Sequence, residues 1–156
     1  MKKLCVTLLL CITLISAIEN VQAQMYWNQA GIFAGNTNSY LSSRHTSAIN
    51  ITGSFTIEAW VHPTAQNSNM YLISKGSAGA YGLSIISDRP TVFTNGISRL
   101  SSKTTTKVPQ NKWTHIAATY NSTLNKYEIY VNGTLDTSGT AVGTAPVSNT
   151  DSMYVG

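Results

Sequence analysis

The chain has 156 residues, of which 42% are hydrophobic and 10% are charged, and its formal net charge is +4. So few charges exclude an acidic disordered chain, and they disfavour coiled coils and surface-charged helical bundles, which need many Glu, Lys and Arg residues. The length suits one domain plus a processing segment.

The N-terminus has the pattern of a secretory signal peptide. Two lysines follow the first methionine, and residues 4–18 form an apolar run that is too short to span a bilayer comfortably. The small residues before Gln24 predict cleavage between Ala23 and Gln24. The alternative, a buried N-terminal helix, has neither a polar face nor a cap. We therefore predict a signal peptide over residues 1–23 and a secreted protein without a membrane span in its mature chain.

The mature chain, residues 24–156, has no cysteine, because Cys5 and Cys11 both precede the predicted cleavage point. It therefore has no disulfide, no thiol nucleophile and no Cys-ligated metal. Its basic residues are dispersed, whereas a nucleic-acid-binding surface needs a dense basic patch, so no nucleic acid partner is predicted.

Alternating apolar and polar residues predict an all-β fold, with strands about 8–12 residues apart and turn-forming residues between them. This spacing is typical of an antiparallel β-sandwich or a barrel. Residues 137–149 are small and polar and are expected to form a surface loop. The predicted strands are residues 30–34, 40–42, 54–63, 70–75, 81–87, 90–94, 97–101, 113–120, 126–131, 134–137 and 153–155.

The strand predicted at residues 54–63 has the clearest alternation, and it turns Glu58, Trp60 and His62 to one face. An exposed aromatic ring can pack on the apolar face of a sugar while amides and carboxylates bind the hydroxyls. These three residues and the loop residue Asn95 are therefore candidate ligand-binding residues. The alternative, which we favour because large aromatics dominate cores, places Trp60 between the sheets or beneath a loop.

The strand at residues 113–120 has no fully polar face, which predicts an inner strand covered on both sides. We expect Trp113 in the core and His115 as a structural histidine. Further along the chain, Asn132 and Gly133 both accept the positive φ of a type I′ turn, so a hairpin with a two-residue turn is predicted there.

Four segments together are similar to the laminin-G-like, concanavalin A-like jelly-roll family of secreted proteins. They are GSFTIEAWVHP (53–63), YLISKG (71–76) with YGLSI (81–85), KWTHIAATY (112–120) and YEIYVNG (127–133). The resemblance covers about residues 30–156 and implies two antiparallel sheets packed face to face. Ala34 stands where the family usually has Asp, and Gly156 stands where a closing segment would begin. We expect residues 24–156 to form one such β-sandwich domain that lacks its last strands.

Some relatives in this family are glycoside hydrolases, which need two carboxylates facing one cleft. Of the five carboxylates in the mature chain, Glu58 and Glu128 each stand alone on a strand. Asp88, Asp136 and Asp151 are predicted in turns, where Asp bonds the local backbone. No catalytic residue is therefore predicted in this segment, although a catalytic domain elsewhere in a longer protein stays open.

The family sometimes binds calcium through loop carboxylates and backbone carbonyls. Calcium takes six to eight oxygens, of which Asp136 and Asp151 could each supply one, so a structural Ca²⁺ is considered without an assigned site. The isolated histidines do not form a zinc site.

These observations predict a secreted, non-catalytic module that binds a carbohydrate or an extracellular protein. Two alternatives remain: a structural or adhesive spacer within a larger surface protein, and an accessory domain of a secreted glycoside hydrolase.

Overall fold

The computed structural model describes residues 30–34, 38–65, 69–76, 79–140 and 145–156. Contacts divide the chain into Met1–Ala34 and Gly35–Gly156, and the strands of the described residues lie in the second unit. The signal peptide predicted at residues 1–23 falls outside the described residues. Within the described part of the chain, no helix is long and apolar enough to cross a bilayer.

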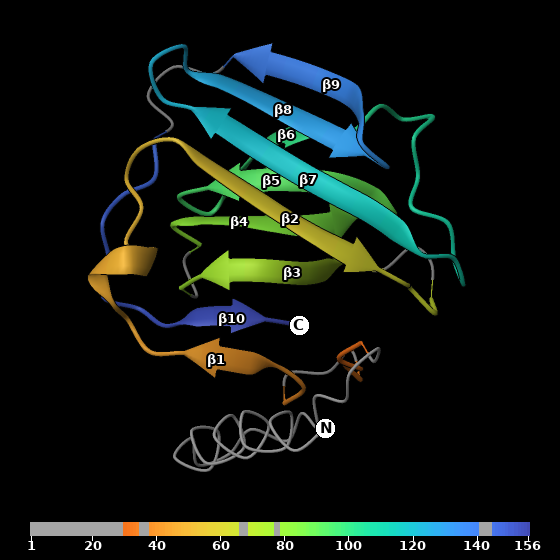
Figure 1. Ribbon diagram of the computed structural model, residues 1–156, viewed down its shortest axis with the longest axis horizontal. Helices are drawn as coiled ribbons and strands as arrows, with labels where there is room; N and C mark the ends of the chain where they lie inside the picture. Colours follow the sequence, from red (N-terminus) through yellow and green to blue (C-terminus); the bar gives the residue numbers. More distant parts are fainter. Residues whose placement is uncertain (1–29, 35–37, 66–68, 77–78, 141–144) are drawn as a thin grey trace, which may run out of the picture. The chain divides into compact units, whose positions relative to one another are not determined.

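The strands form two antiparallel sheets, which confirms the predicted β-sandwich (Figure 1). The six-stranded sheet has the order β1-β10-β3-β4-β5-β6, and the four-stranded sheet has the order β2-β7-β8-β9. The bounds are β1 Leu41–Ser43, β2 Phe55–Val61, β3 Met70–Lys75, β4 Tyr81–Ile86, β5 Arg89–Thr94, β6 Ile97–Ser101, β7 Thr114–Asn121, β8 Lys126–Val131, β9 Thr134–Thr140 and β10 Met153–Val155, with a 3₁₀ turn at Ser47–Ile49.

Two-residue turns join several neighbouring strands, as the sequence predicts. Asn132 and Gly133 have φ values of 50° and 77°, which is the positive pair that a type I′ turn requires. Asn95 and Gly96 make the same kind of turn between β5 and β6, with φ values of 53° and 70°. These turns set the pairing of β8 with β9 and of β5 with β6.

Two of the strand predictions are wrong. Residues 30–34 form no strand, and Ile32 is 94% exposed; a short apolar run becomes a strand only where another strand pairs its backbone. β9 runs to Thr140, further than predicted, because its backbone stays paired with β8 as far as Lys126. Asp136, expected to bond the backbone of a turn, lies within β9, and the predicted loop begins after Thr140 instead of at residue 137.

The core lies between the two sheets and uses the inward half of each alternating strand. Leu83 and Val92 from one sheet meet Ile116 and Ile129 from the other, and all four are fully buried. Buried tyrosines complete the core and keep their hydroxyls bonded: that of Tyr81, for example, donates to the Ile49 carbonyl at 2.8 Å. Burial also raises the pKa of Tyr81. The core thus occupies one face of each sheet and leaves the two outer faces for other roles.

Candidate functional site

The outer face of the four-stranded sheet presents polar and aromatic side chains from β2. Alternation turns Phe55 and Ile57 into the core, so Glu58 and Trp60 face outward, followed by His62 beyond the end of the strand. Trp60 keeps 65% of its surface exposed, so the interpretation that places it between the sheets or beneath a loop is wrong. The inward positions of β2 are already filled by smaller apolar side chains, which leaves the indole in solvent.

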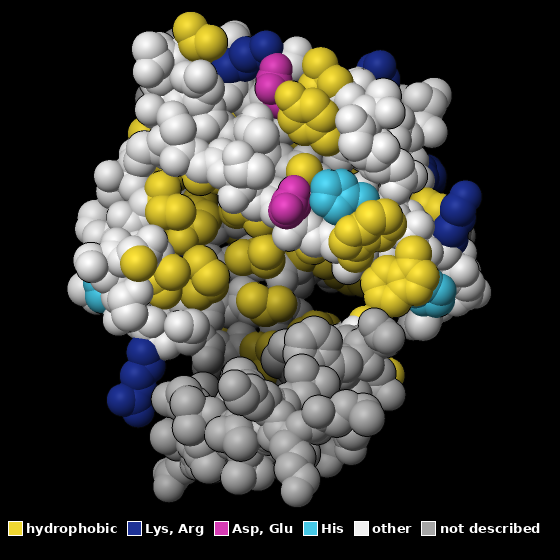
Figure 2. Space-filling model, viewed as in Figure 1, with side chains coloured by type: hydrophobic (Ala, Val, Ile, Leu, Met, Phe, Trp, Pro, Cys, Tyr) yellow, Lys and Arg dark blue, Asp and Glu magenta, His cyan; other side chains and the backbone are white. Residues whose placement is uncertain are grey.

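Strand β7 lies beside β2, and two more rings on this face come from β7 and from the residue that precedes it. Trp60 pairs with His115 across the two strands, and their ring centroids are 5.3 Å apart. Trp113, immediately before β7, lies 5.2 Å from His62 by the same measure. We call Trp60, His62, Trp113 and His115 the aromatic ladder. Figure 2 shows hydrophobic, histidine and acidic side chains side by side on this face of the molecule.

The predicted core position of Trp113 is also wrong, because this side chain is 49% exposed. Thr114, the first residue of β7, is buried at 1% exposure, so alternation turns the preceding residue outward. The prediction of an inner strand is correct, since β7 lies between β2 and β8. The prediction that both its faces are covered is wrong, because the second sheet packs only on its inner face.

An acidic group stands next to the aromatic ladder. The Glu58 carboxylate lies 3.6 Å from Nε2 of His115, and its side chain is 66% exposed. Protonation of His115 would make this contact an ion pair. The carboxylate thus lies beside the Trp60–His115 pair while most of its surface stays open to solvent, where it can accept hydrogen bonds from a ligand.

A shallow depression lies at the other end of the same face, with a volume of about 410 Å³. Thr56, Thr119 and Glu128 contribute side chains to it from three neighbouring strands. Glu128 accepts hydrogen bonds from Lys126 at 2.7 Å and from the Tyr130 hydroxyl at 2.7 Å. These two bonds, with that of Lys126 the larger effect, lower the pKa of Glu128. The depression therefore presents a carboxylate that stays ionised to a lower pH than usual.

Asn95, the fourth candidate residue, lies on the other sheet, in the turn between β5 and β6. Its side-chain amide donates to the carbonyl of Ala145 at 2.9 Å, and its side-chain oxygen accepts from the backbone N–H of Val147 at 3.0 Å. The structure thus brings Glu58, Trp60 and His62 together and leaves Asn95 apart from them, holding a segment of the chain.

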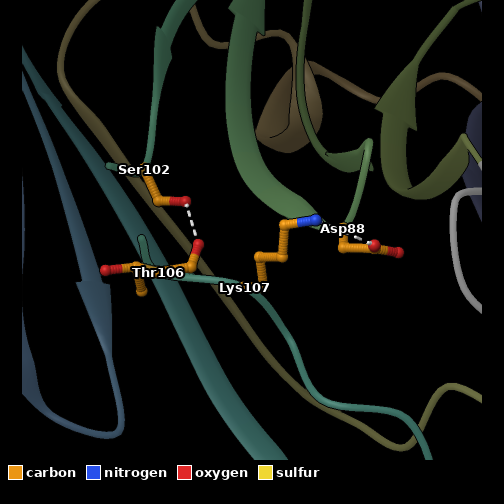
Figure 3. Close-up of polar contacts among 4 residues, drawn as sticks. All are labelled: Asp88, Ser102, Thr106 and Lys107. Carbon is orange, nitrogen blue, oxygen red and sulfur yellow. Dashed lines mark hydrogen bonds and ion pairs between the residues drawn. The ribbon is translucent and has the colours of Figure 1, made fainter. Parts of the chain in front are cut away.

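The aspartates all make contacts within the protein. Asp88 is 4% exposed and lies 3.7 Å from Nζ of Lys107, as Figure 3 shows. The same picture shows the Ser102 hydroxyl bonded to the Thr106 carbonyl, 2.9 Å apart, which closes the intervening loop. The Asp136 carboxylate accepts from the backbone N–H of Lys103 and from the Thr106 hydroxyl, at 2.9 and 2.5 Å. Asp136 and Asp88 therefore tie this loop to β9 and to the β4–β5 turn.

The two carboxylates considered for calcium have different surroundings. Asp136 lies in β9 of the four-stranded sheet, whereas Asp151 precedes β10 of the six-stranded sheet. The backbone carbonyl of Asp151 accepts a hydrogen bond from the buried Lys75 ammonium. Across the described residues, no three His, Cys, Asp or Glu side chains gather in a way that could hold a metal ion.

Sequence reasoning missed that Trp113 and His115 belong to the same site as Trp60. The alternation of residues 113–120 does place these two side chains on one face, but it does not show which strand lies alongside. The sequence also gave no sign that Glu58 and Glu128, on β2 and β8, share one outer face with β7 between them. Such neighbours follow from strand order, which local pattern does not specify.

Comparison with known proteins identifies the family of this fold. The family model described as the concanavalin A-like lectin/glucanases superfamily matches residues 34–156. A search of the curated proteins finds no significant match.

Three solved structures illustrate the likeness. A proposed carbohydrate-binding protein of Bacteroides ovatus is 23% identical, with a TM-score of 0.61 over 75% of this chain and 34% of its own. The CBM40 domain of a Ruminococcus gnavus sialidase, bound to α2,3-sialyllactose, is 14% identical, with a TM-score of 0.58 over 70% of this chain and 66% of its own. The binding domain of a botulinum neurotoxin, in complex with rat synaptotagmin II, is 14% identical, with a TM-score of 0.57 over 74% of this chain and 31% of its own.

The chain thus spans between about a third and two thirds of the length of these neighbours. At these identities the structural likeness establishes the fold alone, while the family match extends over most of the sequence. The chain belongs to the concanavalin A-like lectin/glucanase superfamily.

Proposed function

We propose that this domain is a secreted, non-catalytic module that binds carbohydrate on the aromatic ladder. The observation that carries the proposal is that Trp60 and Trp113 expose 65% and 49% of their surfaces on one face of one sheet. Exposed indoles in such positions are well suited to stack on the apolar faces of sugar rings. His115 and His62 pack against the two indoles and limit their rotation, which lowers the entropy lost on binding.

Polar groups beside the rings supply the hydrogen bonds that a sugar requires. The exposed Glu58 carboxylate can accept from vicinal hydroxyls next to Trp60. The depression around Glu128 continues the same face and offers the hydroxyls of Thr56 and Thr119. A chain of several sugar units lying along this face would therefore meet both rings and acceptors.

Binding without catalysis fits the carboxylates of the described residues. Asp88 and Asp136 are engaged with the loop at residues 102–107. Glu58 and Glu128 share a face, but Glu128 is held by Lys126 and Tyr130, so it does not have the raised pKa of a general acid. The neighbours from Bacteroides ovatus and Ruminococcus gnavus, described as carbohydrate-binding, support the same ligand class.

The experiment is a screen of the exported domain on a glycan array, followed by calorimetry on the best oligosaccharide. Trp60→Ala and Trp113→Ala should each weaken binding by tenfold or more, since truncating a central aromatic typically costs about 2 kcal/mol or more. Tyr40→Ala serves as the matched control, because Tyr40 is 49% exposed and packs against Tyr154 in the other sheet. Unchanged affinity in both tryptophan variants would exclude the aromatic ladder as the site.

A protein ligand is the second candidate, because exposed Trp and Tyr side chains are also enriched at protein interfaces. The botulinum neurotoxin neighbour in complex with synaptotagmin II supports this alternative. Binding of an extracellular protein that depends on Trp60 and persists in excess oligosaccharide would favour it. A domain that binds neither class would leave the spacer role.

Secretion is part of the proposal and rests on the pattern of residues 1–23. Expression of the whole chain in a bacterium, followed by N-terminal sequencing of the exported product, tests it directly. The expected mature chain begins at Gln24. Retention of the uncleaved chain inside the cell would contradict secretion without affecting the proposed binding site.

A further inference from the structure

The outer face of the six-stranded sheet has a hollow of about 200 Å³ that the aromatic ladder does not use. It lies over β3, β4, β5 and β6, and its lining includes Tyr71, Ser74, Ser84, Phe93 and Ser98. These residues alternate with core residues such as Leu83 and Val92, so they face away from the other sheet. The hollow therefore opens on the opposite side of the sandwich from Trp60.

Two glycines give the hollow its aromatic floor. A Cβ on Gly82 would lie 2.3 Å from the Phe93 ring, and one on Gly79 would lie 2.6 Å from it. Because Gly82 and Gly79 have no side chain, the Phe93 ring packs directly against the sheet, where it is 5% exposed. The Tyr71 ring stands edge-on to it, with centroids 5.6 Å apart and an interplanar angle of 85°. Tyr71 itself remains 60% exposed and forms an upright aromatic wall.

Hydroxyl groups supply the polar part of the lining. The Ser84 hydroxyl donates to the Thr91 carbonyl at 3.2 Å, and the Ser74 hydroxyl donates to the Gly76 carbonyl at 2.9 Å. Ser84 is buried at 1% exposure, so of these two hydroxyls only that of the part-buried Ser74 can accept a hydrogen bond from a ligand. Ser98 adds an exposed hydroxyl from the edge strand β6. No Lys, Arg, His, Asp or Glu is among the described residues that line the hollow.

These features select a ligand by size and charge. The volume is below the roughly 300–1,000 Å³ of pockets that hold drug-sized molecules, so it suits a single ring. A charged group would find no counter-ion there and would lose hydration without compensation. A ring that is neutral, apolar on one face and rich in hydroxyl donors matches both the aromatic wall and the serine acceptors.

We propose that this hollow is a second binding site, which takes one neutral pyranose unit stacked on Tyr71 and bonded to Ser74 and Ser98. The site is separate from the aromatic ladder and does not depend on it. Since the two sites lie on opposite sheets, one domain could hold two glycan chains at once. Multivalent attachment of this kind raises overall affinity when both sites can be engaged together.

The test is an NMR titration of the ¹⁵N-labelled chain with three probes: the methyl pyranosides of glucose, galactose and mannose. At least one should produce saturable shifts at the amides of Ser84, Phe93 and Ser98. Tyr71→Ala should weaken that binding at least tenfold. Ser98→Arg should abolish it by filling the hollow, while Ile97→Arg, an adjacent exposed position with the same added charge, should leave it unchanged.

The Trp60→Ala variant separates this proposal from the proposed function. Shifts in the hollow that persist in Trp60→Ala and vanish in Ser98→Arg establish an independent second site, whatever happens at the ladder. Absence of saturable shifts at the hollow with all three glycosides would overturn the proposal. Shifts that survive Ser98→Arg would overturn it equally, and neither result would bear on glycan binding by the ladder.

Discussion

Replacing Gly133 with alanine isolates the backbone cost of the turn between β8 and β9. Gly133 has a φ of +77°, and a Cβ built on it meets no atom within 4 Å, so packing does not contribute. A left-handed conformation costs a residue with a side chain about 1–2 kcal/mol. Alanine also lowers the conformational entropy of the unfolded chain, and this effect alone raises the free energy of unfolding by about 0.4–1 kcal/mol. The net expectation is a loss of about 1 kcal/mol in the free energy of unfolding.

Gly53→Ala is the matched control. A Cβ at Gly53 also meets no atom within 4 Å, but the backbone there is outside the left-handed region. This variant should therefore be more stable than the wild type by about 0.4–1 kcal/mol. Gly133→Asn should lose less than Gly133→Ala, because Asn tolerates positive φ.

Urea denaturation measures all three variants, and the m value should not change because the same surface is exposed on unfolding. In thermal unfolding, a loss of 1 kcal/mol corresponds to a decrease in Tm of roughly 2–8 °C for a domain in this size range. If Gly133→Ala is as stable as the wild type, or if Gly53→Ala loses as much as Gly133→Ala, the reasoning from backbone conformation is refuted.

Three further predictions concern the core, one carboxylate and one loop. Ile116→Ala, at a fully buried position, should reduce the free energy of unfolding by about 2–5 kcal/mol, whereas Leu124→Ala, at 62% exposure, should change it by less than about 0.5 kcal/mol; similar losses in both would contradict the assigned core. Because folding lowers the pKa of Glu128 below 4.5, its stabilising effect is present above that pH and is lost as the pH falls through the folded pKa. The stability difference between wild type and Glu128→Gln should therefore shrink below pH 4.5, and a difference that grows in acid would disprove the sign. Asp136→Ala should speed hydrogen exchange at the Lys103 amide roughly tenfold, equivalent to about 1.4 kcal/mol, and unchanged exchange would show that this bond does not hold the loop.

Much of the fold could be predicted because its signals are local. The alternation in Phe55–Val61 specifies which side chains share a face, and a period of two survives whatever lies next to the strand. The pair Asn132 and Gly133 specifies a turn by backbone sterics alone. The failures were the strand predicted at residues 30–34, which does not form, and the end of β9, which extends to Thr140; in both cases pairing with a neighbouring strand decides.

The candidate site divides in the same way. Sequence placed Glu58, Trp60 and His62 on one face of a strand; in the structure Glu58 and Trp60 lie on the outer face of β2, and His62 lies beyond its end, against Trp113. It favoured the wrong environment for Trp60 and Trp113, because a large aromatic suits a core and an exposed site equally well by composition. It also grouped Asn95 with them, although that residue lies on the other sheet.

What the sequence determined by itself is the class of fold, the faces of the main strands and the type I′ turn, since each depends on residues only a few positions apart. Only the tertiary structure decided that β7 lies beside β2, which brings Trp113 next to His62 and His115 next to Trp60. It also decided that Phe93 lies over two glycines to form a hollow on the opposite sheet. Both outcomes depend on strand order, which is set by the packing of the whole core between two sheets and not by any one segment.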